Sequence, residues 1–100
     1  MFHRHSAEGF HPVLDGIEVK RPVFGERMLL SEFRMKKGSR PPRHAHPQEQ
    51  TGWLLAGRIL LSIGSGQREM APGDFWSVPA GIEHGAEILE DSTAIEVFSP

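Results

Sequence analysis

Glycine and proline interrupt this chain at close intervals along its whole length. There are 11 glycines and 8 prolines among 100 residues, and they are spread out rather than gathered in one linker. Both residue types end helices and strands and favour turns, so the chain offers little room for long helices. No stretch of ten or more residues keeps the 3.6-residue apolar repeat of a helix. The spacing predicts many short strands, and therefore an all-β, antiparallel sandwich or barrel.

Several segments have the residue types and the alternation of strands. We expect residues 52–56 and 58–63 to form a hairpin around Gly57, closed by the turn residues GSGQ. Many of the strands are apolar on both faces, so one face should fill the interior and the other should be covered by the N-terminal segment or a second subunit. The expected strands are 28–35, 52–56, 58–63, 74–78, 83–88 and 93–98, with an extended segment at 39–46.

Length and charge narrow the class of protein. A chain of 100 residues has room for one hydrophobic core, so we expect a single domain, 1–100. A net charge of −2 without a lysine or arginine run argues against nucleic acid or an anionic membrane as the main partner. No apolar stretch approaches the roughly 20 residues of a membrane span, and the N-terminus lacks the apolar region of a signal peptide, so we expect a cytoplasmic protein. Without cysteine, any metal must be held by nitrogen and oxygen ligands.

Three histidines are candidates for such a site. His44 and His46 stand one residue apart in an extended segment, so their side chains point the same way. Pro47 then ends the strand, and Gln50 is placed to return beside the two imidazoles. His84 follows a Pro-Ala-Gly turn at the head of another short strand. Three neutral imidazoles and one oxygen would suit divalent Zn, Ni, Fe, Mn or Cu, and an open coordination position would make the site catalytic.

The same spacing occurs a second time in the chain, near the N-terminus. His3 and His5 are also one residue apart, but no strand or turn residues surround them in a pattern that would hold an ion. We interpret them, together with His11, as solvated polar residues.

Two stretches resemble the two sequence motifs of the cupin family. Residues 38–57 have the order Gly-x5-His-x-His-x3-Gln-x6-Gly, in which Gln50 stands at the usual glutamate position. Residues 73–88 have the order Gly-x5-Pro-x-Gly-x2-His, and Ile88 replaces the asparagine that usually ends the motif. The resemblance implies a cupin jelly-roll barrel, or double-stranded β-helix, over residues 26–100, preceded by an N-terminal arm and first strands at 1–25. It also implies a metal inside the barrel, with these ligands: His44, His46, Gln50 and His84.

A closer resemblance is to the small pectin-degradation cupins, through HPQEQTGWLLAG and the final AIEVFSP. Those proteins are thought to convert unsaturated uronates into linear keto-acids. The resemblance implies an anionic sugar acid as substrate and Glu96 and Phe98 as pocket residues, with Glu96 where the family usually has aspartate. The family also has a basic tail whose arginine could meet the substrate carboxylate. Here an arginine of the body could take that role, and the candidates are Arg34, Arg40 and Arg43.

Three function classes remain open at this point. The first is a metal-assisted isomerase or lyase, in which Glu96 moves a proton and the ion is Ni, Zn, Fe or Mn. The second is a metal-dependent dioxygenase, and the third is a small-molecule binding or sensor module without catalysis. Glu96 could also be a solvent-facing edge residue, and Phe98 could be core rather than pocket wall. We expect a homodimer, with Trp53 or Trp76 as interface anchors if they lie on the outer face.

Overall fold

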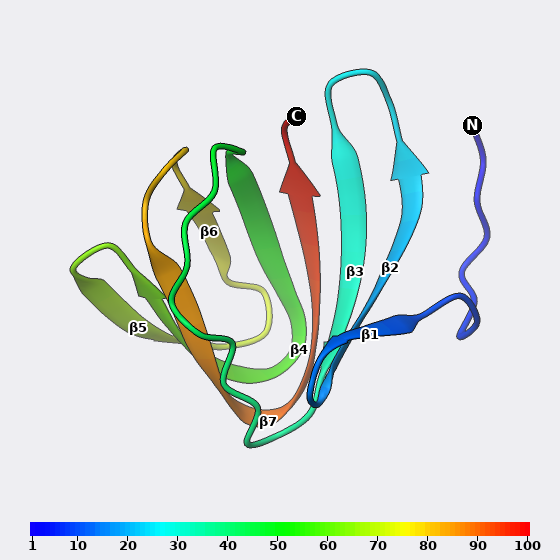
Figure 1. The fold of residues 1–100 in the computed structure, drawn as a ribbon. Coiled ribbons are helices and arrows are strands. Elements are labelled where there is room, and N and C mark those ends of the chain that lie inside the picture. Colours follow the sequence, from blue (N-terminus) through cyan, green and yellow to red (C-terminus); the bar gives the residue numbers. More distant parts are fainter.

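The computed structural model describes residues 1–100 and consists of seven antiparallel strands without a helix (Figure 1). This confirms the all-β prediction. The structure contains no helix with the length and apolarity that a membrane crossing requires. The strands are β1 (His11–Leu14), β2 (Ile17–Phe24), β3 (Leu29–Met35), β4 (Gln50–Ile63), β5 (Gly66–Met70), β6 (Phe75–Val78) and β7 (His84–Phe98).

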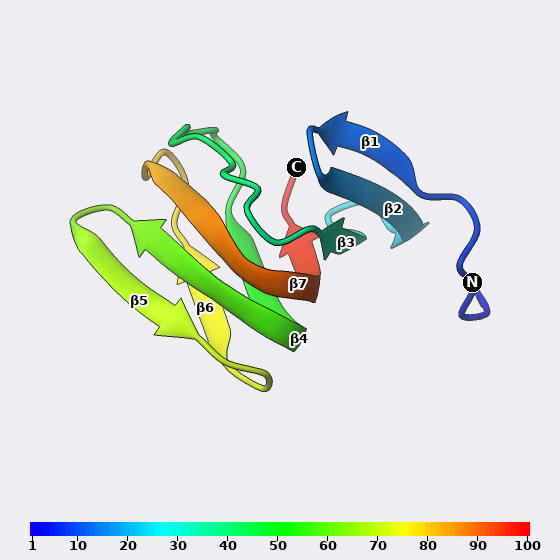
Figure 2. The same ribbon diagram turned by 90° about the horizontal axis from the view of Figure 1, so that it is seen from below.

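Two long strands, β4 and β7, organise the barrel. They pair with each other from Gln50↔Phe98 at one end to Ile63↔His84 at the other, and both bend in the middle. The first half of β4 and the second half of β7 lie in one sheet with β6, β3, β2 and β1, whereas their other halves lie with β5. The two halves face each other across an interior that is visible when the molecule is seen from below (Figure 2).

The expected hairpin at Gly57 is wrong, because Gly57 marks the bend inside β4 rather than a chain reversal. Its φ is +93°, and a Cβ there would lie 2.1 Å from the Ser92 hydroxyl oxygen. Glycine therefore lets β4 turn the corner against β7 without a clash. The hairpin lies further on, at residues 64 and 65, and it leads into β5, which the sequence pattern did not predict as a strand. Likewise, residues 83–88 and 93–98 belong to one long strand.

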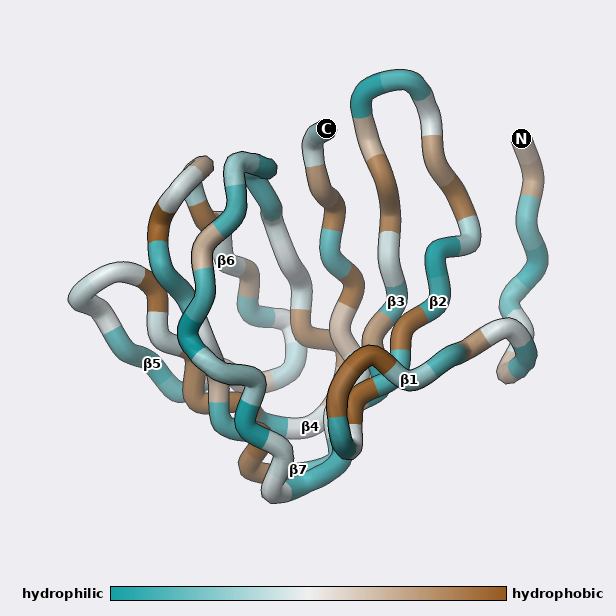
Figure 3. Tube along the Cα trace, in the orientation of Figure 1, coloured by the Kyte–Doolittle hydropathy of each residue, from teal (hydrophilic) through white to brown (hydrophobic).

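The core follows the alternation of β4 and β7. Leu54 is fully buried, whereas its neighbours Trp53 and Leu55 on the other face are each 41% exposed. Burying a side chain of this size contributes roughly 1.5–3 kcal/mol, so the inward row is the main source of stability. Figure 3 shows apolar stretches where β1 turns into β2 and in the lower parts of β4 and β7. The central cluster contains Leu54, Ile59, Met70, Ile88 and Ala94.

The segment between β3 and β4 is extended, as predicted, and runs alongside the first half of β7 (Figure 1). The backbone amides of Ile88 and Ala86 donate to the carbonyls of Ser39 and Pro41, at 2.9 and 3.3 Å. A Cβ on Gly85 would lie 3.1 Å from the Arg43 amide nitrogen, so the absence of a side chain permits this close approach. The segment is therefore fastened to β7 just before it delivers the two histidines.

The N-terminal arm crosses the outer face of β2 and β3. The ammonium group of Lys20 donates to the Ser6 carbonyl oxygen at 2.9 Å, and the Arg34 guanidinium lies 4.1 Å from the centre of the Phe10 ring. The arm therefore covers charged side chains of β2 and β3, whereas the apolar outer face of β4, with Trp53 and Leu55, stays exposed in the single chain.

Candidate metal centre

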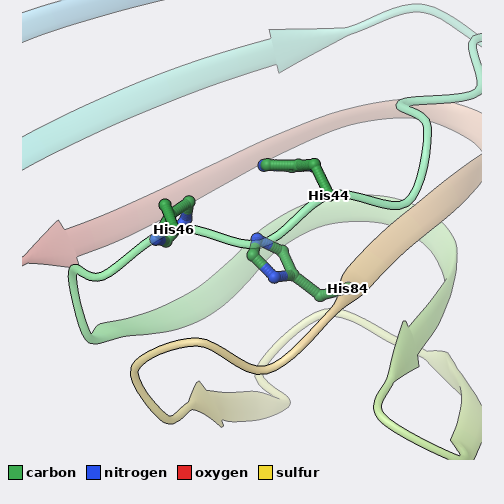
Figure 4. A group of neighbouring side chains, drawn as sticks. All are labelled: His44, His46 and His84. Atoms are coloured by element: carbon green, nitrogen blue, oxygen red, sulfur yellow. The ribbon is translucent and has the colours of Figure 1, made fainter.

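His44, His46 and His84 converge at one end of the barrel (Figure 4). One nitrogen from each ring lies within 4.8 Å of the corresponding nitrogens of the other two, so the three side chains could hold a metal ion. His44 and His84 are joined by an isolated bridge, in which each amide donates to the other's carbonyl at 3.0 Å. The Gly81 amide donates to the His46 carbonyl at 2.9 Å, which ties the two loops together. These backbone hydrogen bonds therefore hold the segments that carry the three imidazoles together.

Each of the three rings is oriented by a hydrogen bond to the backbone. Every Nδ1 lies within hydrogen-bonding distance of a carbonyl oxygen two residues away along the chain, which fixes the proton on Nδ1. The lone pairs of Nε2 are then free, which is the tautomer that a metal-binding histidine needs. Burial lowers the pKa of His84, the hydrogen bond to the Ile82 carbonyl acts in the opposite direction, and the nearby His44, His46 and Arg43 lower the pKa further, so the neutral ring is favoured. The carbonyl partners are Pro42 at 3.0 Å, Gln48 at 2.8 Å and Ile82 at 3.0 Å.

Gln50, the first residue of β4, lines the same cavity and is 5% exposed. Its amide nitrogen donates to the carboxylate of Glu96, whereas its Oε1 is buried without a hydrogen-bond partner. An unpaired buried oxygen is costly, and a bound cation would satisfy it. The donor set of three nitrogens and one oxygen therefore fits a divalent transition metal.

Glu96 points into the interior from β7, and it is not a solvent-facing edge residue. Burial raises the pKa of its carboxyl group to about 7, while hydrogen bonds from the Trp76 indole and the Gln50 amide act in the opposite direction. A carboxyl group with a pKa near neutrality can both donate and accept a proton at physiological pH. Glu96 could therefore act as a general acid or base in the cavity that the three histidines also line.

The cavity between the two sheets has a volume of about 270 Å³. Phe98 forms part of its wall, and its ring lies 6.1 Å from the His46 ring, centre to centre. Trp76 also lines it, which the sequence did not settle, and its ring packs on Gly52, where any Cβ would clash with it. A glycine inside an otherwise apolar strand was the signal for this close packing. Trp53, by contrast, lies on the outer face.

Residues 31–99, more than half of the chain, match the family described as Cupin domain. The chain is a cupin. It is 28% identical to KdgF from a Halomonas species, with a TM-score of 0.87 over 91% of this cupin and 86% of that chain. It also superposes on an RmlC-like cupin from Shewanella frigidimarina with a TM-score of 0.90 at 22% identity, covering 100% and 92% of the two chains. An uncharacterized protein of Streptomyces coelicolor is 28% identical over 73% of this cupin and 70% of its own length.

The cupin fold explains both departures from the motifs. Ile88 is 1% exposed and packs in the core, so the position that usually carries asparagine contributes apolar packing here. Gln50 keeps a side-chain oxygen, as the usual glutamate has, and adds an amide N–H group. This N–H group donates a hydrogen bond to the Glu96 carboxylate. The change to glutamine and the buried carboxylate therefore belong to one polar pair.

None of the three candidate arginines of this cupin lines the cavity. Arg34 lies against Phe10 on the outer face. Arg40 pairs with Glu87 at 3.6 Å, and Arg43 pairs with Glu83 at 3.5 Å. A ligand carboxylate inside the cavity would therefore meet no arginine of this chain.

Proposed function

We propose that this cupin is a metal-dependent enzyme that moves a proton on a small oxygen-bearing acid bound in the barrel. The observation that carries the proposal is the pairing of two sets of groups in one cavity. Three imidazoles and Gln50 Oε1 are free to hold a cation, and next to them lies a carboxyl group whose pKa is raised to about 7. Such a combination of perturbed acid and ligand cluster is typical of a catalytic site.

The residues that would hold the ion are His44, His46, His84 and Gln50. All four are uncharged ligands, so the ion would keep its full charge, and Ni, Zn, Fe and Mn are the candidates. When bound, the metal would supply Lewis-acid polarisation of a ligand oxygen. The chain's own contribution is to fix the ligands through the backbone and to keep bulk water out with an apolar wall.

Glu96 would carry the proton in the reaction. In its ionised form Glu96 would take the proton of the hydroxyl group on C1 of the sugar ring, so that C1 becomes a carbonyl as its bond to the ring oxygen breaks. In its protonated form it would return the proton to the ring oxygen or to C4. The two steps together are an isomerisation, so atoms balance without a co-reactant. Trp76 and Gln50 hold the carboxylate in place, and Phe98 closes the wall beside His46.

An unsaturated uronate is the first substrate to assay, with a linear keto-acid as the expected product. The resemblance to the pectin-degradation cupins and the 28% identity with KdgF support this substrate class. The His, His, Gln, His arrangement of possible ligands supports it as well.

Elemental analysis tests the metal part of the proposal. After incubation with each candidate ion and desalting, we expect about one equivalent bound to the wild type and a large loss in His84→Ala. Turnover of the uronate under anaerobic conditions with Zn or Ni supports proton transfer, whereas strict dependence on Fe and O₂ would favour a dioxygenase. No retained ion in metal-replete wild type contradicts the proposal.

We also propose that the chain forms a homodimer through the outer face of β4 and β6. This surface exposes a stacked pair, Trp53 and Phe75, with ring centres 5.8 Å apart, and Leu55. The accessible surface of 6681 Å² for 11.2 kDa is well above the ~5,700 Å² expected of a compact monomer of this mass. The excess is similar to the ~800 Å² that each partner buries in a standard interface, and the exposed N-terminal arm accounts for part of it.

Light scattering during gel filtration tests the dimer. Trp53→Lys combined with Phe75→Lys should shift the mass from dimer to monomer. Met28→Lys, at an apolar residue that is 65% exposed in the β2–β3 loop, should leave the dimer unchanged. A monomeric wild type at micromolar concentration contradicts this interface.

A further inference from the structure

The polar groups of the cavity occupy one end of it, and strand register shows this directly. His84 and Glu96 lie near the two ends of β7. On the inner face of this strand, the next residues toward its middle are Ala86 after His84 and Ala94 before Glu96. On the strands that pair with β7, Leu61 of β4 is the partner of Ala86, and Phe33 of β3 is the partner of Ala94. One step inward from the histidines and Glu96, the wall is therefore apolar on both sheets.

The apolar end continues to the bottom of the barrel. Ile17 and Met35 pair with each other across β2 and β3, and both line the cavity, as do Ile59 of β4 and Leu14 of β1. These side chains offer no hydrogen-bond donor or acceptor that could match a hydroxyl group of a ligand. The cavity thus has a polar head and an apolar body.

The cavity wall contains few charged side chains, and none of them is a lysine or an arginine. Glu96 is the only acidic residue in this wall. If a ligand has one carboxylate and this group lies at the polar end, the positive charge of the ion held by the histidines would stabilise it. A second carboxylate, placed toward the body, would meet no cation and would lose its hydration.

We propose that the preferred ligand is a small monocarboxylic acid whose polar groups all lie at one end, such as a 2-hydroxy or 2-keto acid with a plain carbon body. This inference rests on the proposed metal site, and it departs from the uronate substrate class, because a uronate carries hydroxyl groups along its carbon chain that the apolar body would leave unpaired. A hydroxyl group buried against the apolar body without a partner lowers affinity about tenfold. Each methylene that replaces water there raises affinity roughly fourfold. The cavity therefore ranks a plain carbon body above a hydroxylated one.

A matched pair of six-carbon acids tests this ranking on the zinc-loaded chain of residues 1–100. Both 2-hydroxyhexanoate and gluconate present the same 2-hydroxy acid head, and they differ only in the four further hydroxyl groups of gluconate. In calorimetric titrations, we expect the dissociation constant of 2-hydroxyhexanoate to be at least about a hundredfold lower than that of gluconate. 2-Hydroxyadipate, which keeps the same head and adds a second carboxylate at the far end, should bind more weakly than 2-hydroxyhexanoate.

Two neighbouring leucines of β4 provide the variant and its control. Leu61 lines the cavity, whereas Leu60, the next residue, faces away from it. Leu61→Asn should reduce the preference for 2-hydroxyhexanoate at least tenfold, and Leu60→Asn should leave it unchanged. Thermal unfolding of both variants checks that they are folded, and the wild-type ranking stands as a test by itself.

The outcomes separate this inference from the proposed function. If zinc is retained but gluconate binds as tightly as 2-hydroxyhexanoate, or neither acid binds, the inference is wrong and the metal site stands. If the wild type retains no zinc, the proposed function itself fails. Retained zinc together with the expected ranking, lost in Leu61→Asn alone, supports the inference.

Discussion

The chain contains two His-x-His pairs of identical spacing, and only one of them lies in a cluster. His3 and His5 are exposed in the N-terminal arm, with no third ligand near them. His44 and His46 lie beside His84, which comes from a strand 38 positions further along the chain. The His-x-His spacing alone is therefore not enough to form a possible metal site.

What differs is the support around each pair. The rings of His44 and His46 are each held by a backbone carbonyl, and the segment that carries them is hydrogen-bonded to β7. The arm has a single long-range polar contact of this kind, the Lys20 ammonium on the Ser6 carbonyl. Ligands that are already held in place lose less conformational entropy when an ion binds, so the ion binds more tightly.

Replacing one histidine of each pair tests most directly whether only the pair at His44 and His46 binds metal. His46→Ala should weaken zinc binding by about a thousandfold, because one of four ligands is lost from a preformed site. His5→Ala should leave the affinity unchanged. Competition against a chromophoric chelator measures both, and an equal loss in the two variants would contradict the assignment of the site.

Glu96 allows the two roles of the polar pair to be separated. Glu96→Gln keeps an acceptor for the Gln50 amide but cannot carry the proton, so kcat should fall about a hundredfold or more while metal affinity persists. Glu96→Leu removes the acceptor as well, and Gln50 Oε1 loses its fixed orientation. Metal affinity should then fall about ten- to a hundredfold, as for other residues that orient ligands. Unchanged turnover in Glu96→Gln would exclude Glu96 as the acid or base.

Stability of the metal-free chain should depend on pH through Glu96. Because the folded-state pKa is raised to about 7 from an ordinary 4.5, the folded state is favoured in full below pH 4.5 and loses this contribution as pH rises through 7. The loss approaches about 3 kcal/mol above pH 8. Urea unfolding at pH 5 and pH 8 measures it. Glu96→Gln should remove this loss and leave the opposite contribution of His84, whose lowered pKa favours the folded state as pH rises. Glu8→Gln, an exposed carboxylate in the arm, should leave the difference in place.

The sequence predicted the fold class and the ligand cluster because both depend on local pattern. Dispersed glycines and prolines excluded helices, and the motif around His44 and His84 implied that the two would meet. The same reasoning failed at Gly57, where a strand bends, because a glycine looks alike in a turn and in a bend until its partner Ser92 is in view. Long-range packing, not local propensity, decided that position.

The polar pair of Gln50 and Glu96 lay beyond the reach of sequence patterns for a related reason. The two residues are 46 positions apart, and their contact depends on the register between β4 and β7. Trp53 and Trp76 were equally ambiguous, since each has apolar neighbours in sequence. Only the pairing of β4 with β6 shows that Trp76 faces the cavity and Trp53 the outer surface.

A glycine substitution should sharpen the contrast between a held and a loose segment. A Cβ on Gly85 would press on the Arg43 amide at 3.1 Å and move the segment that carries the histidines. We expect Gly85→Ala to lower zinc affinity about tenfold and stability by about 1–2 kcal/mol. Gly66→Ala, in the β4–β5 hairpin, meets only one atom at 3.5 Å and should change zinc affinity little. Equal effects would show that the close approach at Gly85 does not position the site.

Removing residues 2–5 should have the smallest effect of all. The removed side chains include both arm histidines, all of them exposed, and the contact between Ser6 and Lys20 is kept. Exposed termini contribute little to folding, so the free energy of unfolding should change by less than about 0.5 kcal/mol. Zinc stoichiometry should stay at one, because the second His-x-His pair has neither a third ligand nor a backbone that holds it. A fall in stoichiometry would mean that the arm pair binds metal, and that spacing alone suffices.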